Sequence, residues 1–184
     1  MKVRTATRDD LESLKAFEQG IIAAERPYDH TIKPDPVNYY DIGELIDSDD
    51  AEVAVVDVDG QLVASGYARK KESRSYVQDT HHAYLGFMYV RPDYRGQGLN
   101  KLLMAHFFDW AKARGLPEVR LTVYSGNRPA ISAYEKAGFS QHIVEMRLNL
   151  VALGEDARAL VTSEASTVSC EISAVSASCG AALG

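Results

Sequence analysis

The chain has 184 residues, of which 46% are hydrophobic and 25% charged, and its formal net charge is −6. This length and balance fit one soluble globular domain with a substantial core. The negative net charge argues against a general nucleic-acid binder, because contacts to phosphates need a basic face. The sequence has no apolar run of transmembrane length and no signal-peptide core at its start, so we expect a cytoplasmic protein with no membrane partner.

The two cysteines, Cys170 and Cys179, lie near the carboxyl end with eight residues between them and no histidine nearby. This usage predicts neither a disulfide framework nor a zinc site. We therefore expect no bound metal and no covalent thiol catalysis.

The amino-terminal part predicts a strand followed by two helices. Lys2–Ala6 is typical of a short edge strand, and Thr7 with Asp10 three residues later predicts a capping box. Apolar residues then recur at helical spacing, which predicts a helix over Asp9–Ala24. Three prolines make the next segment a loop, and a second short helix is predicted over Tyr39–Ile46.

A meander of three strands is predicted next. Two β-rich runs, Ala51–Val58 and Gln61–Arg69, flank the dipeptide Asp59-Gly60, which is a strong signal for a two-residue hairpin turn. A polar connection over Lys70–Asp79 follows, and His82–Arg91 forms the third strand.

The third strand leads into Arg95-Gly96-Gln97-Gly98 and then directly into a helix. Two glycines remove the Cβ atoms that keep a ligand away from the backbone, and the N–H groups of a helix N-terminus favour negative charge. With Lys101 close by, this segment predicts a pyrophosphate cradle. An ordinary strand-to-helix turn is the alternative, and Arg91 fits a solvated strand-end charge as well as a phosphate contact.

The helix after the glycines ends near Gly115 and places six residues on one side: Leu99, Leu102, Leu103, His106, Phe107 and Trp110. It serves as a crossover, so a strand over Glu118–Tyr124 should run parallel to the strand Tyr84–Val90. A further helix beginning at Asn127 and a last strand over Gln141–Leu150 complete the pattern.

Two segments together resemble the Gcn5-related N-acetyltransferase (GNAT) superfamily: Arg95-Gly96-Gln97-Gly98-Leu99-Asn100 and the stretch from Asn127 through Tyr134 to Gly138-Phe139. The resemblance covers roughly residues 2–150, and Asn100 stands where the family has Gly or Ala. It implies the α+β fold of acyl-CoA N-acyltransferases, a mostly antiparallel sheet with one splayed parallel strand pair and helices on both faces.

The resemblance also implies acetyl-CoA as co-substrate. The Met88 N–H would polarise the acetyl carbonyl, Val90 would pair with the pantetheine arm, and Asn127 would contact an amide of that arm. The full set of expected cofactor-binding residues is Met88, Tyr89, Val90, Arg95, Gly96, Gln97, Gly98, Leu99, Asn100, Lys101 and Asn127. Tyr134 lies two helical turns from Asn127 on the same face and would protonate the departing thiolate, the alternative being a core tyrosine.

The acceptor and the general base stay open at this level. Candidate bases on the meander are Glu72, Asp79, His81, His82 and Tyr84. The loop between the first two helices carries Glu25, Tyr28, Asp29 and His30, which suit a cationic amine but also fit solvated loop charges.

The resemblance predicts an N-acetyltransferase that acts by direct attack of a primary amine in a ternary complex. The acceptor amine belongs to a small molecule or to a protein or peptide, and a homodimer is compatible with the sequence. The alternative is a catalytically silent acyl-CoA-binding module that regulates or scaffolds. A dinucleotide oxidoreductase is disfavoured because the third glycine is lacking.

From residue 151 onward serine, alanine, threonine and valine dominate and no aromatic residue occurs. This composition predicts a flexible extension over residues 151–184 rather than a second domain. An added edge strand around Leu160–Val175 is the alternative.

Overall fold

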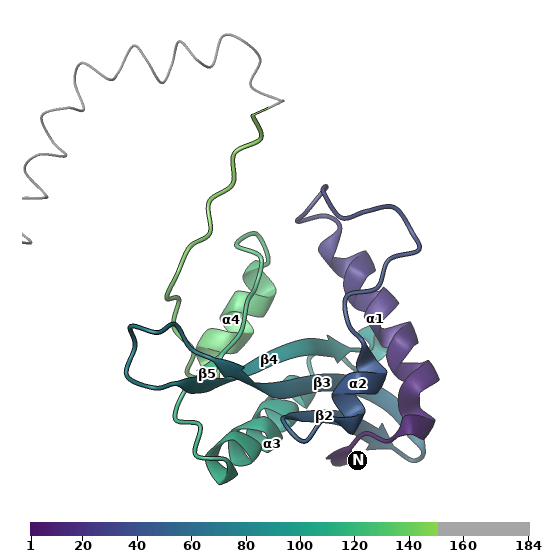
Figure 1. The fold of residues 1–184 in the computed structure, drawn as a ribbon. Coiled ribbons are helices and arrows are strands. Elements are labelled where there is room, and N and C mark those ends of the chain that lie inside the picture. Colours follow the sequence, from purple (N-terminus) through teal and green to yellow (C-terminus); the bar gives the residue numbers. More distant parts are fainter. Residues whose placement is uncertain (151–184) are drawn as a thin grey trace, which may run out of the picture. The chain divides into compact units, whose positions relative to one another are not determined.

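The computed structural model describes residues 1–150. A first compact unit covers Met1–Ser140, and a second unit starts at Gln141. The extension predicted over 151–184 lies outside the described residues, as do both cysteines. The elements of the first unit are β1 (Lys2–Thr5), a 3-10 turn η1 (Arg8–Asp10), α1 (Leu11–Glu25), α2 (Ile42–Asp47), β2 (Ala51–Val58), β3 (Gln61–Glu72), β4 (His81–Val90), a 3-10 turn η2 (Pro92–Tyr94), α3 (Leu99–Ala113), β5 (Val119–Arg120) and α4 (Arg128–Lys136) (Figure 1).

The five strands form one sheet in the order β1-β2-β3-β4-β5. The first three pairings are antiparallel, and β5 lies parallel to β4 because α3 crosses over between them. The predicted hairpin is confirmed between β2 and β3, where Asp59 and Gly60 both have positive φ, as a two-residue turn of this kind requires. The mixed sheet predicted from the sequence is therefore confirmed.

A bulge interrupts β4 at Phe87. Ser65 of β3 pairs with Tyr89 and Tyr67 pairs with Gly86, so that Phe87 and Met88 together face the single residue Gly66. Phe87 has a φ of 57°, a value that costs energy in a bulky residue and is a sign of local strain. Bulges bend a strand and increase its twist. The pairing of β4 with β5 ends at Tyr84, three residues before this bulge.

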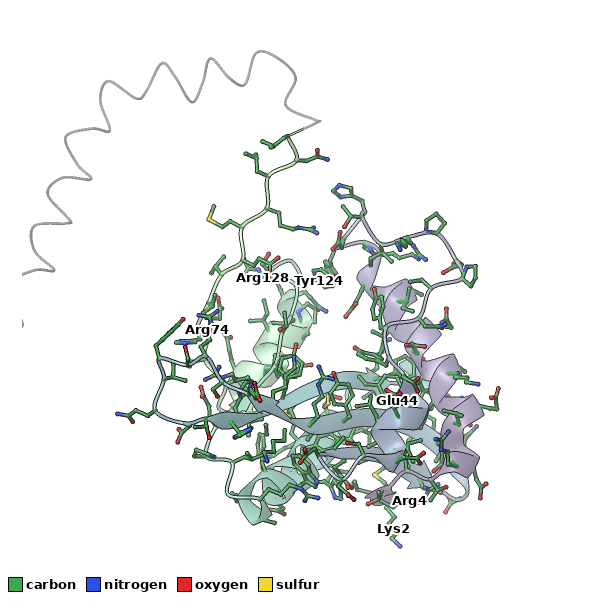
Figure 2. The ribbon with its side chains drawn as sticks, viewed as in Figure 1. Lys2, Arg4, Glu44, Arg74, Tyr124 and Arg128 are labelled. Carbon is green, nitrogen blue, oxygen red and sulfur yellow. The ribbon has the colours of Figure 1, made fainter. Side chains whose placement is uncertain are left out.

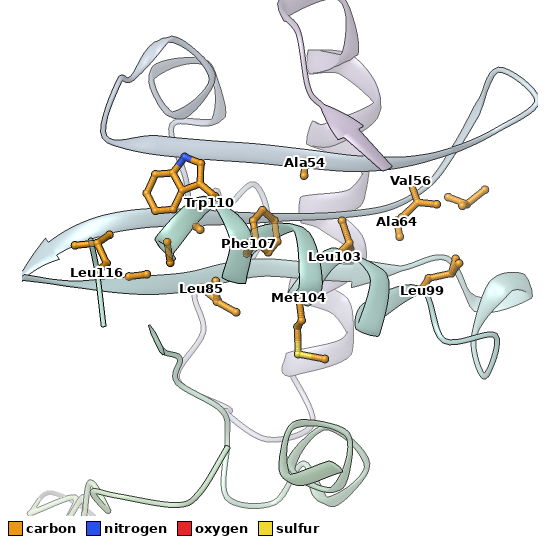
Figure 3. Close-up of a cluster of buried hydrophobic side chains, with 14 residues drawn as sticks. Ala54, Val56, Ala64, Leu85, Leu99, Leu103, Met104, Phe107, Trp110 and Leu116 are labelled. Carbon is orange, nitrogen blue, oxygen red and sulfur yellow. The ribbon is translucent and has the colours of Figure 1, made fainter. Parts of the chain in front are cut away.

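The core has two layers, one on each face of the sheet. On one face α3 inserts a stripe of large side chains over the strands: Leu99, Leu103, Met104, Phe107 and Trp110 (Figure 3). On the other face α1 and α2 cover the sheet, and Leu14, Phe17 and Ile21 pack on Val53 and Val55. Helices thus lie on both faces, as expected.

Besides shifts at the ends of elements, such as β3 continuing to Glu72 into the predicted connection, four details differ from the sequence-based expectations. Leu102 was expected on the buried side of α3, but it is 42% exposed because the buried stripe follows the i, i+4 spacing of Leu99, Leu103 and Phe107. The predicted strand Glu118–Tyr124 is limited to Val119–Arg120, because only that part lies beside β4 before the strands separate.

The other two differences concern the second helix and the last strand. α2 begins at Ile42 rather than Tyr39, because Glu18 binds the backbone N–H groups of Tyr39 and Tyr40 and Asp41 caps the helix. The strand predicted over Gln141–Leu150 is wrong within the described residues, where this segment forms no ladder. A strand needs a partner for its N–H and C=O groups.

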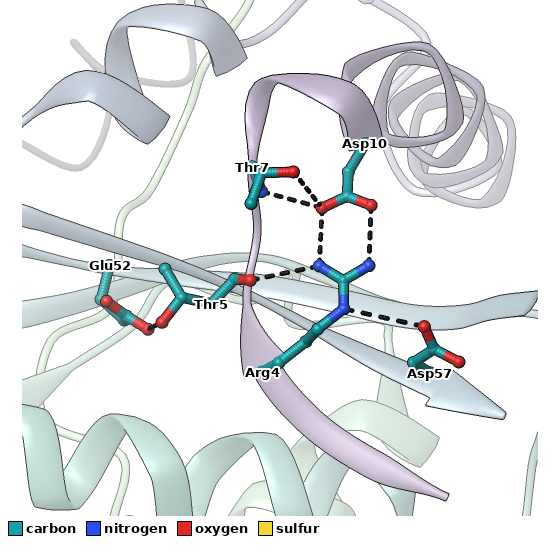
Figure 4. Close-up of polar contacts among 6 residues, drawn as sticks. All are labelled: Arg4, Thr5, Thr7, Asp10, Glu52 and Asp57. Carbon is teal, nitrogen blue, oxygen red and sulfur yellow. Dashed lines mark hydrogen bonds and ion pairs between the residues drawn. The ribbon is translucent and has the colours of Figure 1, made fainter. Parts of the chain in front are cut away.

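An ion pair fixes the start of the chain to the helix that follows it. Arg4 of β1 binds both carboxylate oxygens of Asp10, at 2.7 and 2.8 Å, and its Nε lies 3.6 Å from Asp57 of β2 (Figure 4). The Thr7 N–H donates to the same Asp10 carboxylate at 2.8 Å, which confirms the predicted capping interaction. Arg4 therefore connects β1, β2 and the start of α1.

None of the helices within residues 1–150 is both long and apolar enough to cross a membrane.

Candidate active site

The strand β4, the loop after it and the first turn of α3 form one continuous surface. Gly96 and Gly98 have φ values of 77° and 80°, in the left-handed region that glycine adopts at low cost. A Cβ atom added at either glycine would have no protein atom within 4 Å. Glycine is thus required here by the backbone conformation, and the space over both residues is open to a ligand.

The loop presents a row of unused backbone donors. No backbone acceptor within residues 1–150 receives the N–H groups of the five residues from Gly96 to Asn100, and the first bonded amide is that of Lys101, which donates to the Gly98 carbonyl at 3.0 Å. Consecutive N–H groups at the start of a helix bind anionic groups, and the helix dipole adds to the attraction. The geometry therefore fits a diphosphate.

The polar side chains at this loop differ in their hydrogen bonds and ion pairs. Arg95 and Lys101 are exposed, and the Arg95 Nε contacts the Val90 carbonyl at 3.3 Å. Arg91 forms an ion pair with Asp93 at 2.9 Å, so its charge is already partly neutralised. Asn100 lies within α3, where the buried Oδ1 has no hydrogen-bond partner in the described part of the chain. It therefore does not occupy the left-handed turn itself.

The strand β4 has a free edge next to the bulge. β5 pairs with Ala83 and Tyr84 only, so the edge of β4 from Leu85 to Val90 has no strand beside it within residues 1–150. An extended ligand can pair with such an edge as an additional strand would. The side chains of Met88 and Val90 pack on the core face that α3 covers, while Tyr89 packs on Phe17 of α1 with ring centroids 4.8 Å apart. The side chains are core and the backbone is available.

Helix α4 carries the second sequence motif. The Asn127 side chain caps the helix by accepting the Ala130 N–H at 3.2 Å. Seven residues later, Tyr134 packs against the same core as Met88 and Val90, and its ring lies 5.9 Å from Phe139. Both motif residues are thus on one helix next to β4.

Burial raises the pKa of Tyr134 to about 12, and the negative charge of Glu25 contributes to the same shift. The hydroxyl consequently stays protonated at neutral pH and is available to donate a proton. Glu25, at the end of α1, is thus the carboxylate whose charge acts on Tyr134. Burial raises the pKa of Glu25 itself; Tyr39 acts in the opposite direction, and nearby Asp29 adds to the rise.

The loop after α1 is fixed by buried and half-buried polar groups. Glu18 is 2% exposed, and one of its oxygens accepts the N–H groups of Tyr39 and Tyr40 at 2.7 and 2.8 Å. Asp29 accepts from the Thr31 N–H and hydroxyl, at 3.0 and 2.6 Å. Carboxylates that accept several hydrogen bonds hold a loop in place and are poor proton acceptors.

The same loop meets the segment before α4. Tyr28 stacks on Tyr124 with ring centroids 6.2 Å apart, and the Tyr124 hydroxyl donates to Asp29 at 3.3 Å. Tyr124 is labelled in Figure 2, beside Arg128 at the start of α4. Of the loop residues expected to receive an acceptor, Glu25, Tyr28 and Asp29 are brought together here, whereas His30 is exposed and makes no hydrogen bond within residues 1–150.

The candidate bases on the meander lie at the far end of the sheet. His82 is buried, with Nδ1 3.0 Å from the Ser73 hydroxyl, and its pKa is lowered by burial and by Arg120. His81 contacts Thr80 at 3.0 Å. Glu72 and Asp79 are exposed to solvent. Among the carboxylates, Glu25 is the one whose charge contributes to the raised pKa of Tyr134.

No cluster of three or more potential metal-ligating side chains occurs within residues 1–150.

Three functional features were missed by the sequence analysis. The bulge at Phe87 has no sequence signal, because phenylalanine rarely takes a positive φ. Glu18 was given no role, although a glutamate on the apolar face between Phe17 and Ile21 is a detectable signal. Tyr124 was treated as part of a strand, and its contact with Asp29 depends on the fold of two distant loops.

The Acetyltransferase (GNAT) family matches residues 18–139 of the chain, about two thirds of its length and the whole region just described. The chain belongs to this family.

Two relatives and one solved structure illustrate the relationship. An acetyltransferase of Sodalis glossinidius (strain morsitans) is 29% identical over 158 residues, covering 84% of this chain and 94% of the relative. A streptothricin acetyltransferase of Streptomyces lavendulae is 34% identical over 94 residues, covering 51% of this chain and 47% of the relative. The match thus spans about half the length of that enzyme. A crystal structure of a predicted acetyltransferase from Clostridium acetobutylicum with acetyl-CoA has a TM-score of 0.63 at 20% identity, and the match covers 82% of this chain and 97% of that one.

The chain therefore belongs to the GNAT acetyltransferase family and shares the fold of this solved structure. Members of the fold have been solved with acetyl-CoA or CoA bound. Which amine this GNAT protein acetylates depends on the surface outside the cofactor cradle, because a shared fold does not determine the second substrate.

Proposed function

We propose that this GNAT protein transfers the acetyl group of acetyl-CoA to a primary amine by direct attack in a ternary complex. The observation that carries the proposal is the continuity of β4 with the glycine loop. The strand has an unpaired edge and a bulge, and it continues into a row of free N–H donors from Gly96 to Asn100. Tyr134 packs against the same core cluster as Met88 of the bulge. This arrangement suits a ligand with a diphosphate at one end and an extended arm ending in a thioester.

The chain's own groups divide the work along that strand. The loop amides and Arg95 hold the diphosphate, with Lys101 nearby. The edge of β4 at Val90 pairs with the amide-bearing arm, to which Asn127 contributes. The N–H of Met88, at the bulge, donates to the acetyl carbonyl oxygen as negative charge develops on it. A backbone donor of this type is worth about 10²–10³ in rate.

Proton transfers accompany the bond changes. The amine nitrogen forms a bond to the carbonyl carbon, the carbon–sulfur bond breaks, and the sulfur leaves as a thiolate that takes the Tyr134 proton. Glu25 accepts the proton that the amine loses. Its half-buried position and raised pKa support this role, since a base is most effective when its pKa lies near the working pH. The products are an acetamide and free CoA.

Thiol release from acetyl-CoA, measured across a panel of primary amines, tests the proposal. We expect release to depend on the amine and an acetylated product to form in equal amount. Tight CoA binding in calorimetry with no transfer to any amine, peptide or protein would contradict it and favour a silent acyl-CoA-binding module instead. Absence of CoA binding at millimolar concentration would contradict both.

A further inference from the structure

A row of cations crosses the sheet beyond the end of α1 and α2. Tyr84 of β4 pairs with Arg69 of β3 on one side and with Arg120 of β5 on the other. The Lys71 ammonium lies over the Tyr84 ring, 4.0 Å from its centroid. We call Arg69, Lys71 and Arg120 the basic patch. Paired residues in a sheet lie on the same face, so the basic patch and Tyr84 share one surface.

That surface is the face of the sheet on which α1 lies. Tyr84 and Tyr67 both pack with the cluster under α1 and α2, whereas the neighbours Ala83 and Ala68 belong to the cluster under α3. Figure 1 shows the β3–β4 hairpin extending past α1 and α2, so these helices leave its end uncovered. The basic patch is therefore on the same face as Glu25 and the loop after α1.

Acidic residues compensate the basic patch only in part, since Glu118 and Asp79 both act on Arg120. Arg69 and Lys71 form no ion pair within residues 1–150, while Arg120 pairs with Glu118 at 2.5 Å. The Nε atoms of Arg69 and Arg120 are buried and have no hydrogen-bond acceptor in the described part of the chain. A buried donor without an acceptor is costly, more so when it is charged. Burial and Arg69 both lower the pKa of Lys71, as expected where like charges are close together.

The position of the basic patch relative to the proposed reaction assigns it to the acceptor. Under the proposed function the cofactor approaches β4 from the glycine loop at its carboxyl end, and the thioester reaches Met88. The residues before the bulge are then on the far side of the thioester, where the second substrate enters. Tyr84 precedes Met88 by four residues, which corresponds to roughly 13 Å along a strand.

We propose that the basic patch binds an anionic group, a carboxylate or a phosphate, that the acceptor carries at a distance of several bonds from its reactive amine. Arg69 and Lys71 supply the charge, and Tyr84 forms the apolar floor between the anion and the reaction centre. The acceptor is therefore an amine with a remote negative charge, not a simple polyamine. This inference rests on the proposed function, which supplies the direction of entry.

Matched pairs of amines test the inference. One pair is N-α-acetyl-lysine and its carboxamide, and the other is 6-aminohexyl phosphate and 6-aminohexanol. We expect kcat/KM to favour the charged member of at least one pair by about 10- to 100-fold, the range of a hydrogen bond to a charged group. The two pairs distinguish a carboxylate from a phosphate. Equal kcat/KM within both pairs, in a protein that acetylates amines, would overturn the inference and leave the proposed function intact.

Substitutions in the basic patch provide a second test of the inference. Arg69→Gln and Lys71→Gln should each raise KM for the charged acceptor and bring the ratio within the pair toward one. Lys70→Gln is the matched control, because Lys70 is exposed on the same strand but on the opposite face. Preservation of the ratio in both patch variants, with folding checked by circular dichroism, would contradict the proposal.

Calorimetry with the CoA-loaded protein separates this inference from the proposed function. If no amine is acetylated, the proposed function is contradicted. Binding of the charged probes then still tests whether the basic patch is an anion site. Binding of a charged probe that Arg69→Gln weakens at least about 10-fold would support the anion site. No binding of either charged probe at millimolar concentration would refute it.

Discussion

The hydroxyl of Tyr124 donates a hydrogen bond to Asp29 at 3.3 Å, joining two loops that lie 95 residues apart in the sequence. The stacking of Tyr28 on the Tyr124 ring adds to the same contact. Asp29 is in the loop after α1, where we propose that the acceptor binds, and Tyr124 precedes α4, which we propose contacts the cofactor. The loop after α1 is thus attached to the segment that carries Asn127. Under the proposed function, this contact gives the two binding regions a shared support.

Removing this hydrogen bond should weaken acceptor binding more than catalysis. For Tyr124→Phe we expect KM for the acceptor to rise about 2- to 10-fold, because a net hydrogen bond contributes about 0.5–1.5 kcal/mol. Steady-state kinetics at saturating acetyl-CoA measures the change. Tyr76→Phe is the matched control, since its hydroxyl contacts Arg74 on the exposed β3–β4 hairpin. A drop in kcat with unchanged KM would contradict the idea that Tyr124 positions the loop after α1.

Gly98→Ala should weaken CoA binding beyond its effect on folding. A Cβ at Gly98 meets no protein atom within 4 Å, so the cost to the fold is confined to the positive φ, about 1–2 kcal/mol. The same Cβ enters the space over the loop amides, and we expect Kd for CoA to rise at least about 10-fold in calorimetry.

Gly60→Ala is the control for this substitution. Gly60 has a φ of 85° and likewise no atom within 4 Å of an added Cβ, but it lies in the β2–β3 turn. It should show the same loss of stability and an unchanged CoA affinity. Equal affinities for the two variants would show that the glycine loop does not contact the diphosphate.

The sequence predicted the elements that depend on local chemistry. The hairpin at Asp59-Gly60, the capping interaction of Thr7 with Asp10 and the crossover helix after Gly98 all follow from neighbouring residues. The features that it did not predict depend on distant partners. The length of β5 is set by its separation from β4, and the start of α2 is set by Glu18, more than twenty residues away.

The residues of the candidate site likewise differ in whether local sequence patterns predict them. Gly96, Gly98, Asn127 and Tyr134 belong to motifs whose spacing is visible in the chain. The influence of Glu25 on the pKa of Tyr134 depends on the folding of α1 over the sheet, which a single sequence does not show. The bulge at Phe87 and the basic patch arise from strand register, which single-sequence patterns do not determine.

The turnover rate should fall as pH decreases, which gives an acid limb. Deprotonation of Tyr134 should not lower the rate below about pH 11. Protonation of Glu25, whose pKa is raised, removes the base as pH falls, while the Tyr134 pKa of about 12 keeps its proton in place as pH rises. Rates of thiol release between pH 5 and pH 10, at saturating substrates, are the measurement.

Two substitutions test whether Glu25 causes the acid limb and whether Tyr134 donates the proton. Glu25→Gln should lower kcat about 10²- to 10⁴-fold and abolish the acid limb, and Tyr134→Phe should lower kcat by a similar factor without moving that limb. Glu12→Gln, an exposed glutamate at the other end of α1, is the control for the first change. An unchanged acid limb in Glu25→Gln would exclude Glu25 as the proton acceptor, and full activity of Tyr134→Phe would remove that residue from the mechanism.

The ion pair of Arg4 with Asp10 should make the stability of the fold depend on pH in the acid range. The guanidinium of Arg4 lowers the pKa of Asp10 to about 2, below the value near 3.9 of an unfolded aspartate. A carboxylate with a lowered pKa stabilises the native state above the unfolded pKa, and the contribution is lost as pH falls from about 4 to 2. Because Arg4 is partly exposed, we expect this contribution to be about 1–2 kcal/mol.

Urea unfolding of Asp10→Asn should show a constant deficit in the free energy of unfolding from pH 5 to 8, and this deficit should shrink between pH 4 and 2. Asp9→Asn, an exposed neighbour, should follow the wild-type curve throughout, and a deficit in Asp10→Asn that persists at pH 2 would show that packing rather than charge is responsible.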